Sequence, residues 1–174
     1  MDLVIQITGI LGILASVISF QCKKHKSILF FRSANEFIFA IQYFLLGAYT
    51  GMAVNLVGCL RNYVFSKQVS NNNKTAASIT FFSLLFITFG FLTWQGWKSM
   101  LIIVAKVLST IAYGNKNTTF VRTGILITST SWLIYNCCVS SVAGVICEAF
   151  TLLSLVAGII RLDVIPALSK HTAK

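Results

Sequence analysis

Apolar runs of about 20 residues recur along the chain from one end to the other. A helix of that length crosses a hydrocarbon layer of roughly 30 Å. The polar residues between the runs divide the chain into seven segments, at 3–21, 28–47, 50–66, 75–94, 97–113, 119–138 and 141–161. The pattern therefore predicts an all-α integral membrane protein with seven transmembrane helices.

Composition supports a membrane protein over a soluble one. Of the 174 residues, 56% are hydrophobic and only 10% are charged, whereas a soluble domain has roughly 25% charged residues. The first segment is not a cleaved signal peptide, because Asp2 precedes it and Lys23, Lys24 and Lys26 follow it.

The net charge of +10 does not indicate nucleic-acid binding, because the basic residues stand at the ends of apolar segments and not on one folded face. On one predicted side of the membrane they fill the connections and the tail, whereas the other side has Lys98 alone. The first set is Lys23, Lys24, Lys26, Lys67, Lys74, Lys116, Lys170 and Lys174. The positive-inside rule then predicts an N-terminus outside and a C-terminus in the cytoplasm.

Seven crossings can divide as three, one and three. The motif FFRS at 30–33 resembles FVRT at 120–123, and the pair Gly51 and Asn55 stands 93 residues before Gly144 and Glu148. We therefore expect two parallel triple-helix bundles at 1–66 and 97–165, with a transport site between them. A linker loop and an inverting helix would occupy 67–96, and a cytoplasmic tail 166–174. The polar stretch 66–78 is expected to be a mobile linker.

Five polar or aromatic side chains on four of these helices fall at nearly the same depth. At about 1.5 Å per residue, Lys106 and Glu148 both lie on the order of 10–12 Å below the outer ends of their helices, with Asn55, Trp132 and Asn136 close to that level. An ionised side chain at such depth costs roughly 3 kcal/mol or more, so it faces a partner or a wet cavity. These five residues are our predicted substrate site.

Two explanations account for the presence of a charged residue, Glu148, within an apolar helix. The carboxylate meets either Lys106 or water in a central cavity. A Glu148–Lys106 pair that only fixes the helix register is the structural alternative.

Charged residues nearer the cytoplasmic ends have simpler explanations. Glu36 stands four residues after Arg32, a spacing that suits a local ion pair on one helix, and a cytoplasmic gate is the alternative. Arg61 and Arg161 are expected to snorkel towards the interface.

The sequence gives little support for catalysis or for metal and cofactor binding. Two histidines, His25 and His171, lie in a basic loop and in the tail, and no metalloprotease, P-loop or hydrolase motif is present. The two buried carboxylates stand at different depths, which disfavours a hydrolase. The cysteines lack metal-ligand spacing and are read as small buried hydrophobes, with a Cys137–Cys138 redox pair as the alternative; they are Cys22, Cys59, Cys137, Cys138 and Cys147.

The stretch STSWLIYNCCVSSVAGVICEAFTLLSLVAGIIR at 129–161 resembles the YgjV-like family of bacterial inner membrane proteins, as does YFLLGAYTGMAVNLVGCLRN at 43–62. This resemblance implies a multi-pass protein of the bacterial inner (cytoplasmic) membrane. The layout is more distantly similar to the SWEET and PnuC-type (PQ-loop-like) transporters. That similarity implies that Trp132 stacks on a flat or sugar-like solute and that Asn136 hydrogen-bonds it. The chain departs from SWEET bundles in having its one proline, Pro166, beyond the last segment.

These observations favour a transporter or facilitator of a small polar metabolite, such as a sugar, a nucleoside or a vitamin precursor, that works by alternating access. Facilitated diffusion is the simpler mechanism, and proton coupling through Glu148 is the alternative. A membrane scaffold or partner subunit without transport is the rival function. The expected partners are the solute and the lipid bilayer, no nucleic acid is expected, and the sequence allows a homo-oligomer.

Overall fold

A computed structural model describes residues 2–21, 25–70, 75–115, 118–160 and 165. Within these ranges the chain forms seven α-helices and no strands, which confirms the all-α prediction. The helices are α1 (Asp2–Gln21), α2 (His25–Leu45), α3 (Tyr49–Ser70), α4 (Ala76–Leu92), α5 (Trp97–Tyr113), α6 (Thr118–Cys138) and α7 (Val142–Ile159). By hydropathy, none of the described helices is both long and apolar enough to qualify as a membrane span.

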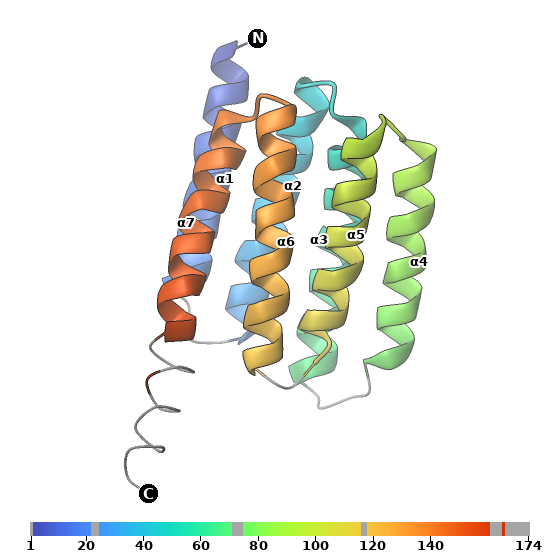
Figure 1. The fold of residues 1–174 in the computed structure, drawn as a ribbon, viewed down its shortest axis with the longest axis vertical. Helices are drawn as coiled ribbons and strands as arrows, with labels where there is room; N and C mark the ends of the chain where they lie inside the picture. The colour runs from blue at the N-terminus through green and yellow to red at the C-terminus, as the bar shows by residue number, and fades with distance from the viewer. Residues whose placement is uncertain (1, 22–24, 71–74, 116–117, 161–164, 166–174) are drawn as a thin grey trace, which may run out of the picture.

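The helices stand side by side and run alternately up and down (Figure 1). Contacts join α1 to α2, α2 to α3, α3 to α5, α5 to α6, α6 to α7 and α7 back to α1, so these helices close a ring. Helix α4 lies outside the ring, against α3 and α5. The turns after α2, α4 and α6 share one end of the bundle, at the top of Figure 1, which we call the turn end.

The α2–α3 and α6–α7 hairpins have the same backbone geometry, 93 residues apart. Helix α6 (Thr118–Cys138) repeats the bounds of α2 (His25–Leu45) at that offset. The amide of Ala48 donates to the Tyr43 carbonyl at 2.8 Å, and the amide of Ser141 donates to the Asn136 carbonyl at 3.0 Å. The offset of 93 seen in the sequence is therefore also an offset between equivalent backbone hydrogen bonds.

Each of these hairpins turns through a residue with a positive φ angle. Gly47 has φ 69° and Ser140 has φ 57°, a left-handed conformation that glycine adopts without steric cost and serine does not. Ser141 then caps α7, because its side-chain oxygen accepts a hydrogen bond from the amide of Gly144. The second hairpin thus keeps the turn of the first at the expense of some backbone strain.

Polar side chains tie the α4–α5 connection to the start of α3 at the turn end. The hydroxyl groups of Thr50 and Ser99 lie 2.8 Å apart. The side chain of Gln95 donates to the Gly47 carbonyl at 2.8 Å. These contacts fix α4 and α5 against the first hairpin.

Small residues allow two close helix contacts elsewhere in the bundle. A Cβ atom added to Gly9 would lie 2.3 Å from the Cβ of Ala143, and one added to Gly90 would lie 2.3 Å from the Cγ1 of Ile103. Backbones that approach so closely are typical of helix packing in membranes. Large apolar side chains cover the outward faces, among them Leu3, Leu14, Phe44, Leu60, Phe81, Leu92, Met100, Ile127, Phe150 and Leu153.

Helix α3 is longer than predicted. The mobile linker expected from residue 66 is wrong over 66–70, because α3 continues to Ser70. Ser66 is buried, and the side chain of Gln68 donates to the Ser78 hydroxyl at 2.6 Å, which holds the last turn of α3 against α4. The predicted domain limits stay predictions. Several residues on which the sequence interpretation drew lie outside the described part, namely Cys22, Lys23, Lys24, Lys74, Lys116, Arg161, Pro166, Lys170, His171 and Lys174.

Candidate functional site

A central cavity lies among α2, α3, α5, α6 and α7, with a volume of about 70 Å³. Such a volume has room for a small solute or a few water molecules. Charged, amide and aromatic side chains line it, among them Arg32, Asn35, Glu36, Tyr43, Asn55, Arg61, Lys106, Ser129, Trp132, Asn136 and Glu148.

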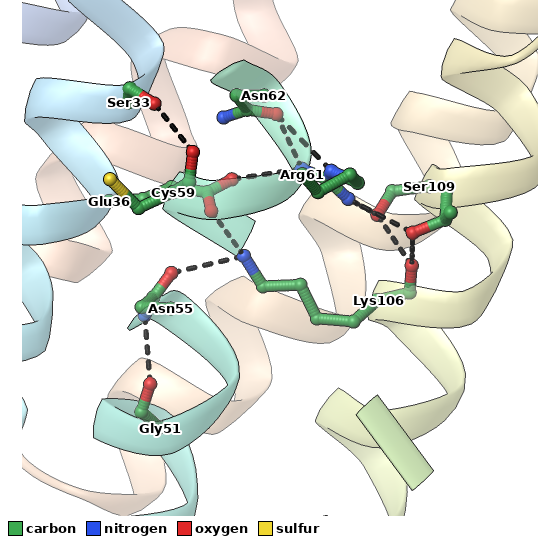
Figure 2. Close-up of polar contacts among 10 residues, drawn as sticks. Ser33, Glu36, Gly51, Asn55, Cys59, Arg61, Asn62, Lys106 and Ser109 are labelled. Atoms are coloured by element: carbon green, nitrogen blue, oxygen red, sulfur yellow. Dashed lines mark hydrogen bonds and ion pairs between the residues drawn. The ribbon is translucent and has the colours of Figure 1, made fainter. Parts of the chain in front are cut away.

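Glu36, Arg61 and Lys106 form an ion cluster (Figure 2), and all three side chains line the cavity. Glu36 on α2 accepts from the Arg61 guanidinium of α3 at 3.0 Å through Oε1, and its Oε2 lies 3.2 Å from the Lys106 ammonium of α5. The Arg61 side chain is 1% exposed and the Glu36 side chain 13%. Two cations from different helices thus share one carboxylate away from bulk solvent.

Arg61 is held by neutral partners as well. Its Nη1 donates to the hydroxyl groups of Ser109 and Thr110 at 3.1 Å each, and its Nη2 donates to the Asn62 side-chain carbonyl at 3.0 Å. Arg61 was expected to snorkel to the interface, and that expectation is wrong because the guanidinium is buried. A buried charge with this many partners is fixed in position.

Gly58 makes room for the ion cluster. A Cβ atom at this position would lie 1.7 Å from Glu36 Oε2 and 2.8 Å from the Lys106 Nζ. Any larger residue would therefore have to displace the carboxylate. Gly58 belongs to the polar face of α3 that also carries Asn55 and Asn62.

Lys106 reaches from α5 across the cavity to α2 and α3. Its ammonium donates to the Asn55 side-chain carbonyl at 3.1 Å, in addition to the contact with Glu36. It also lies 5.2 Å from the ring centroid of Trp132, within cation–π range. The side chain is 4% exposed, so these contacts replace water almost completely.

Glu148 lies on the side of α7 that faces the same cavity, and of its two predicted surroundings, Lys106 or a cavity, Lys106 is not its partner. The Lys106 ammonium pairs with Glu36 instead, so the Glu148–Lys106 pair of the structural alternative is wrong. Ser129 of α6 lines the same cavity. Its Oε2 atom is buried and has no hydrogen-bond partner within the described part of the chain. One carboxylate oxygen is therefore available to a molecule in the cavity.

An aromatic and amide layer lies between the cavity and the turn end. The Tyr43 hydroxyl donates to Asn136 Oδ1 at 2.6 Å, and the Tyr135 hydroxyl accepts from the Gly51 amide at 3.1 Å. The ring of Trp132 stacks on Tyr43 with centroids 5.9 Å apart. Tyr43 and Asn136 stand 93 residues apart, so the bond joins equivalent positions of the two hairpins.

A second hollow, the turn-end pocket, lies beyond this layer and has a volume of about 250 Å³. Tyr135 lines it and also contacts the rings of Tyr43 and Trp132 edge-on, with centroids 5.7 and 5.5 Å apart. Gln95 and Lys98 contribute polar groups to the same pocket. Tyr135 thus lines the turn-end pocket and contacts two aromatic residues, Tyr43 and Trp132, that line the central cavity.

The structure brings the predicted site residues together around one cavity. The five substrate-binding candidates all line it, and so do both residues of the predicted gate or ion pair, Arg32 and Glu36. The Glu36 carboxylate pairs with Arg61 and Lys106, while the Arg32 guanidinium lies 5.8 Å from the ring centroid of Tyr113. The roles in substrate binding and gating stay predictions.

Sequence reasoning missed Tyr43 and Ser129 as cavity residues. The offset of 93 residues could have identified them, because in this repeat Tyr43 corresponds to Asn136 and Ser129 corresponds to Glu36. Among the described residues, no three His, Cys, Asp or Glu side chains group as metal ligands. The described cysteines are free thiols.

No curated protein matches the chain, and neither does any solved structure. A family model described as a bacterial inner membrane protein, Imp-YgjV, matches residues 3–164, which is nearly the whole chain. The chain therefore belongs to the Imp-YgjV family of bacterial inner membrane proteins.

Proposed function

We propose that the chain crosses the inner membrane seven times, as two parallel three-helix halves, α1–α3 and α5–α7, joined by α4. The repeated hairpin geometry at an offset of 93 residues supports the two halves. The apolar outward faces support a lipid environment, and helices of 20 to 22 residues such as α1, α2 and α3 are about 30 Å long. The basic connections favour a turn end that faces outside and a cytoplasmic C-terminus.

The proposed function of this assembly is the passage of a small polar metabolite by alternating access between the two halves. The observation that carries the proposal is the central cavity, with its buried charges, its indole and a Glu148 oxygen that has no hydrogen-bond partner among the described residues. Buried ionisable groups in membrane helices mark solute or ion pathways, because sealing them in apolar protein is costly. The site lies between the halves, where parallel-repeat transporters place it.

The solute would be sugar-like, nucleoside-like or related to a vitamin precursor, in keeping with the distant likeness to SWEET and PnuC-type carriers. In this reading Trp132 supplies a stacking surface, and Asn136 and Asn55 supply hydrogen bonds. The proposal assigns no catalysis to the chain.

Contacts that join the two halves would act as closures above and below the solute. Towards the turn end, the Tyr43–Asn136 bond links α2 to α6. The ion cluster links Lys106 of α5 to Glu36 of α2. Alternating access requires these two contacts to break in turn, so that the cavity opens to one side at a time.

Thiol labelling tests this mechanism without knowledge of the solute. In a chain whose native cysteines are replaced, Ser129→Cys places a thiol in the cavity, and Ile127→Cys places one on the outward face of the same helix, where Ile127 is 54% exposed. A small membrane-impermeant thiol reagent is added to right-side-out and to inverted vesicles. The Ser129→Cys protein is expected to react in both, and the Ile127→Cys control in neither.

Labelling of Ser129→Cys from one side only, or from neither, would contradict alternating access. A cavity closed to both sides would instead favour the scaffold or partner subunit.

A further inference from the structure

The Tyr135 side chain joins the two proposed halves at the turn end. Its hydroxyl accepts a hydrogen bond from the Gly51 amide at 3.1 Å, which links α6 to the first turn of α3. An amide in the first turn of a helix has no partner within that helix, so Tyr135 supplies the acceptor that water would otherwise provide. A Cβ atom at Gly51 would lie 2.7 Å from the Tyr135 hydroxyl oxygen and 3.1 Å from Tyr43 Cδ2, so the glycine makes room for this contact.

The equivalent residue of the first half, Gln42, makes a corresponding link. Gln42 stands 93 residues before Tyr135. Its Oε1 accepts from the Ser141 hydroxyl at 3.2 Å. The same Ser141 oxygen accepts from the amide of Gly144, which lies in the first turn of α7 and corresponds to Gly51. Each half therefore uses a side chain of its second helix, α2 or α6, to hold the start of the other half's third helix.

The two links border two hollows that are partly built from equivalent positions. Tyr135 lines the turn-end pocket, whereas Gln42 lines a hollow of about 420 Å³ among α1, α2 and α7, which we call the apolar groove. Lys98 of the turn-end pocket corresponds to Ile5 of the apolar groove. Most of the other side chains that line the groove are also apolar, among them Ile10, Ile13, Leu46, Val142 and Ile146. The repeat thus places a polar hollow beside one link and an apolar hollow beside the other.

This difference in polarity favours one route into the central cavity. A polar solute that loses its hydrogen-bond partners on the way pays a large cost in free energy. The Lys98 ammonium can replace such partners in the turn-end pocket. The apolar groove is bordered by exposed side chains such as Ile10, which would face lipid in the proposed topology.

Tyr135 also contacts side chains of the central cavity. Its ring meets those of Tyr43 and Trp132 edge-on, with centroids 5.7 and 5.5 Å apart, and both of these residues line the cavity. Movement of this one side chain is therefore the smallest change that could join the turn-end pocket to the cavity.

We propose that the turn-end pocket is the vestibule through which the solute enters and that Tyr135 is the gate between this vestibule and the central cavity. The gate opens when the Tyr135 hydroxyl leaves the Gly51 amide, which then takes water or the solute as its partner. Release of the Gln42 link gives no equivalent entrance, because the apolar groove lies beside it. The inference rests on the proposed transport function and specifies the path of the solute.

The rate at which Ser129→Cys is labelled from the turn end tests the gate. The same vesicles and impermeant reagent are used, and a protein that keeps Cys138 as its one cysteine shows which orientation exposes the turn end, because Cys138 is exposed and lines the turn-end pocket. Tyr135→Phe keeps the ring and removes the hydrogen bond, so it is expected to speed labelling about fivefold. Tyr135→Ala also removes the ring and is expected to speed labelling about tenfold or more. Tyr49→Phe, which changes an exposed tyrosine at the start of α3, is the control and should leave the rate unchanged.

Bulky side chains placed in the two hollows distinguish the two entrances. Cys138→Trp fills part of the turn-end pocket and is expected to slow labelling of Ser129→Cys from the turn end several-fold. Cys137→Trp changes the neighbouring exposed position, outside that pocket, and Ile10→Trp fills part of the apolar groove. Both of these variants are expected to leave the rate unchanged.

An unchanged labelling rate in both Tyr135 variants would overturn the inference. Slower labelling in Ile10→Trp but not in Cys138→Trp would also overturn it, because the solute would then enter through the apolar groove. Failure of the transport proposal is read separately, from labelling of the parent Ser129→Cys protein in the two vesicle orientations. If that protein reacts from neither side, labelling of the Tyr135→Ala variant from the turn end would still support the gate, and the absence of labelling would reject it.

Discussion

Replacing Gly58 with alanine probes the ion cluster with the smallest possible change. The added methyl group would lie 1.7 Å from Glu36 Oε2 and 2.8 Å from the Lys106 Nζ, so the carboxylate has to move. Breaking a buried ion pair costs about 3–5 kcal/mol. Alanine recovers about 1 kcal/mol through its higher helix propensity. We therefore expect Gly58→Ala to lower the free energy of unfolding by about 2–4 kcal/mol.

Thermal unfolding in detergent measures this loss, which for a chain of this size corresponds to a Tm lower by about 5–15 °C. A double-mutant cycle with Glu36→Ala identifies its cause. In the Glu36→Ala background the methyl group has no carboxylate to displace, so Gly58→Ala should be neutral or slightly stabilising. An equal loss of stability in both backgrounds would refute the reasoning, as would a single variant that unfolds like the parent.

Two further predictions concern the hairpin turns and the aromatic and amide layer. Ser140→Gly should stabilise the protein by about 1 kcal/mol, because glycine adopts the left-handed conformation of this position without strain. Gly47→Ser at the equivalent turn should destabilise the protein by a similar amount. Thermal unfolding of the two variants measures both changes, and a loss of stability in Ser140→Gly would show that Ser140 is not strained. Tyr43→Phe removes the 2.6 Å bond to Asn136 and should cost about 1 kcal/mol of stability. It should also speed labelling of Ser129→Cys from the turn end several-fold, and unchanged labelling there would show that this bond does not close the cavity.

The depth of the site residues could be predicted from the sequence because depth in a helix depends only on residue count. Counting from the turns placed Asn55, Lys106, Trp132, Asn136 and Glu148 near one level, and all five line one cavity. Hydropathy likewise located each helix, because apolar runs and polar connections alternate clearly along this chain.

The partners of the charged residues could not be predicted, because they depend on helix rotation and on which helices are neighbours. Counting gives Lys106 and Glu148 similar depths, yet Lys106 points to Glu36 on α2. Arg61 was placed near a helix end because the sequence suggested an end at 66. Helix α3 continues to Ser70, which leaves Arg61 about 13 Å from the end, too deep to snorkel.

The two hairpins share a backbone geometry but not a charge pattern, and this difference bears on how a solute would bind. At the offset of 93 residues, Glu36 corresponds to Ser129 and Lys106 corresponds to Ile13, so the ion cluster is not repeated at the equivalent positions. The cations are gathered on one wall, and Glu148 stands on another helix across the cavity. A symmetric cavity would hold a solute in two equivalent orientations, whereas this cavity would distinguish the two ends of the proposed solute. Under the proposed mechanism, the repeated backbone would let two similar halves rock about the cavity, while the unrepeated charges would fix the orientation of the solute. For this reason, substitutions at Lys106 and Glu148 are expected to alter different parts of solute recognition.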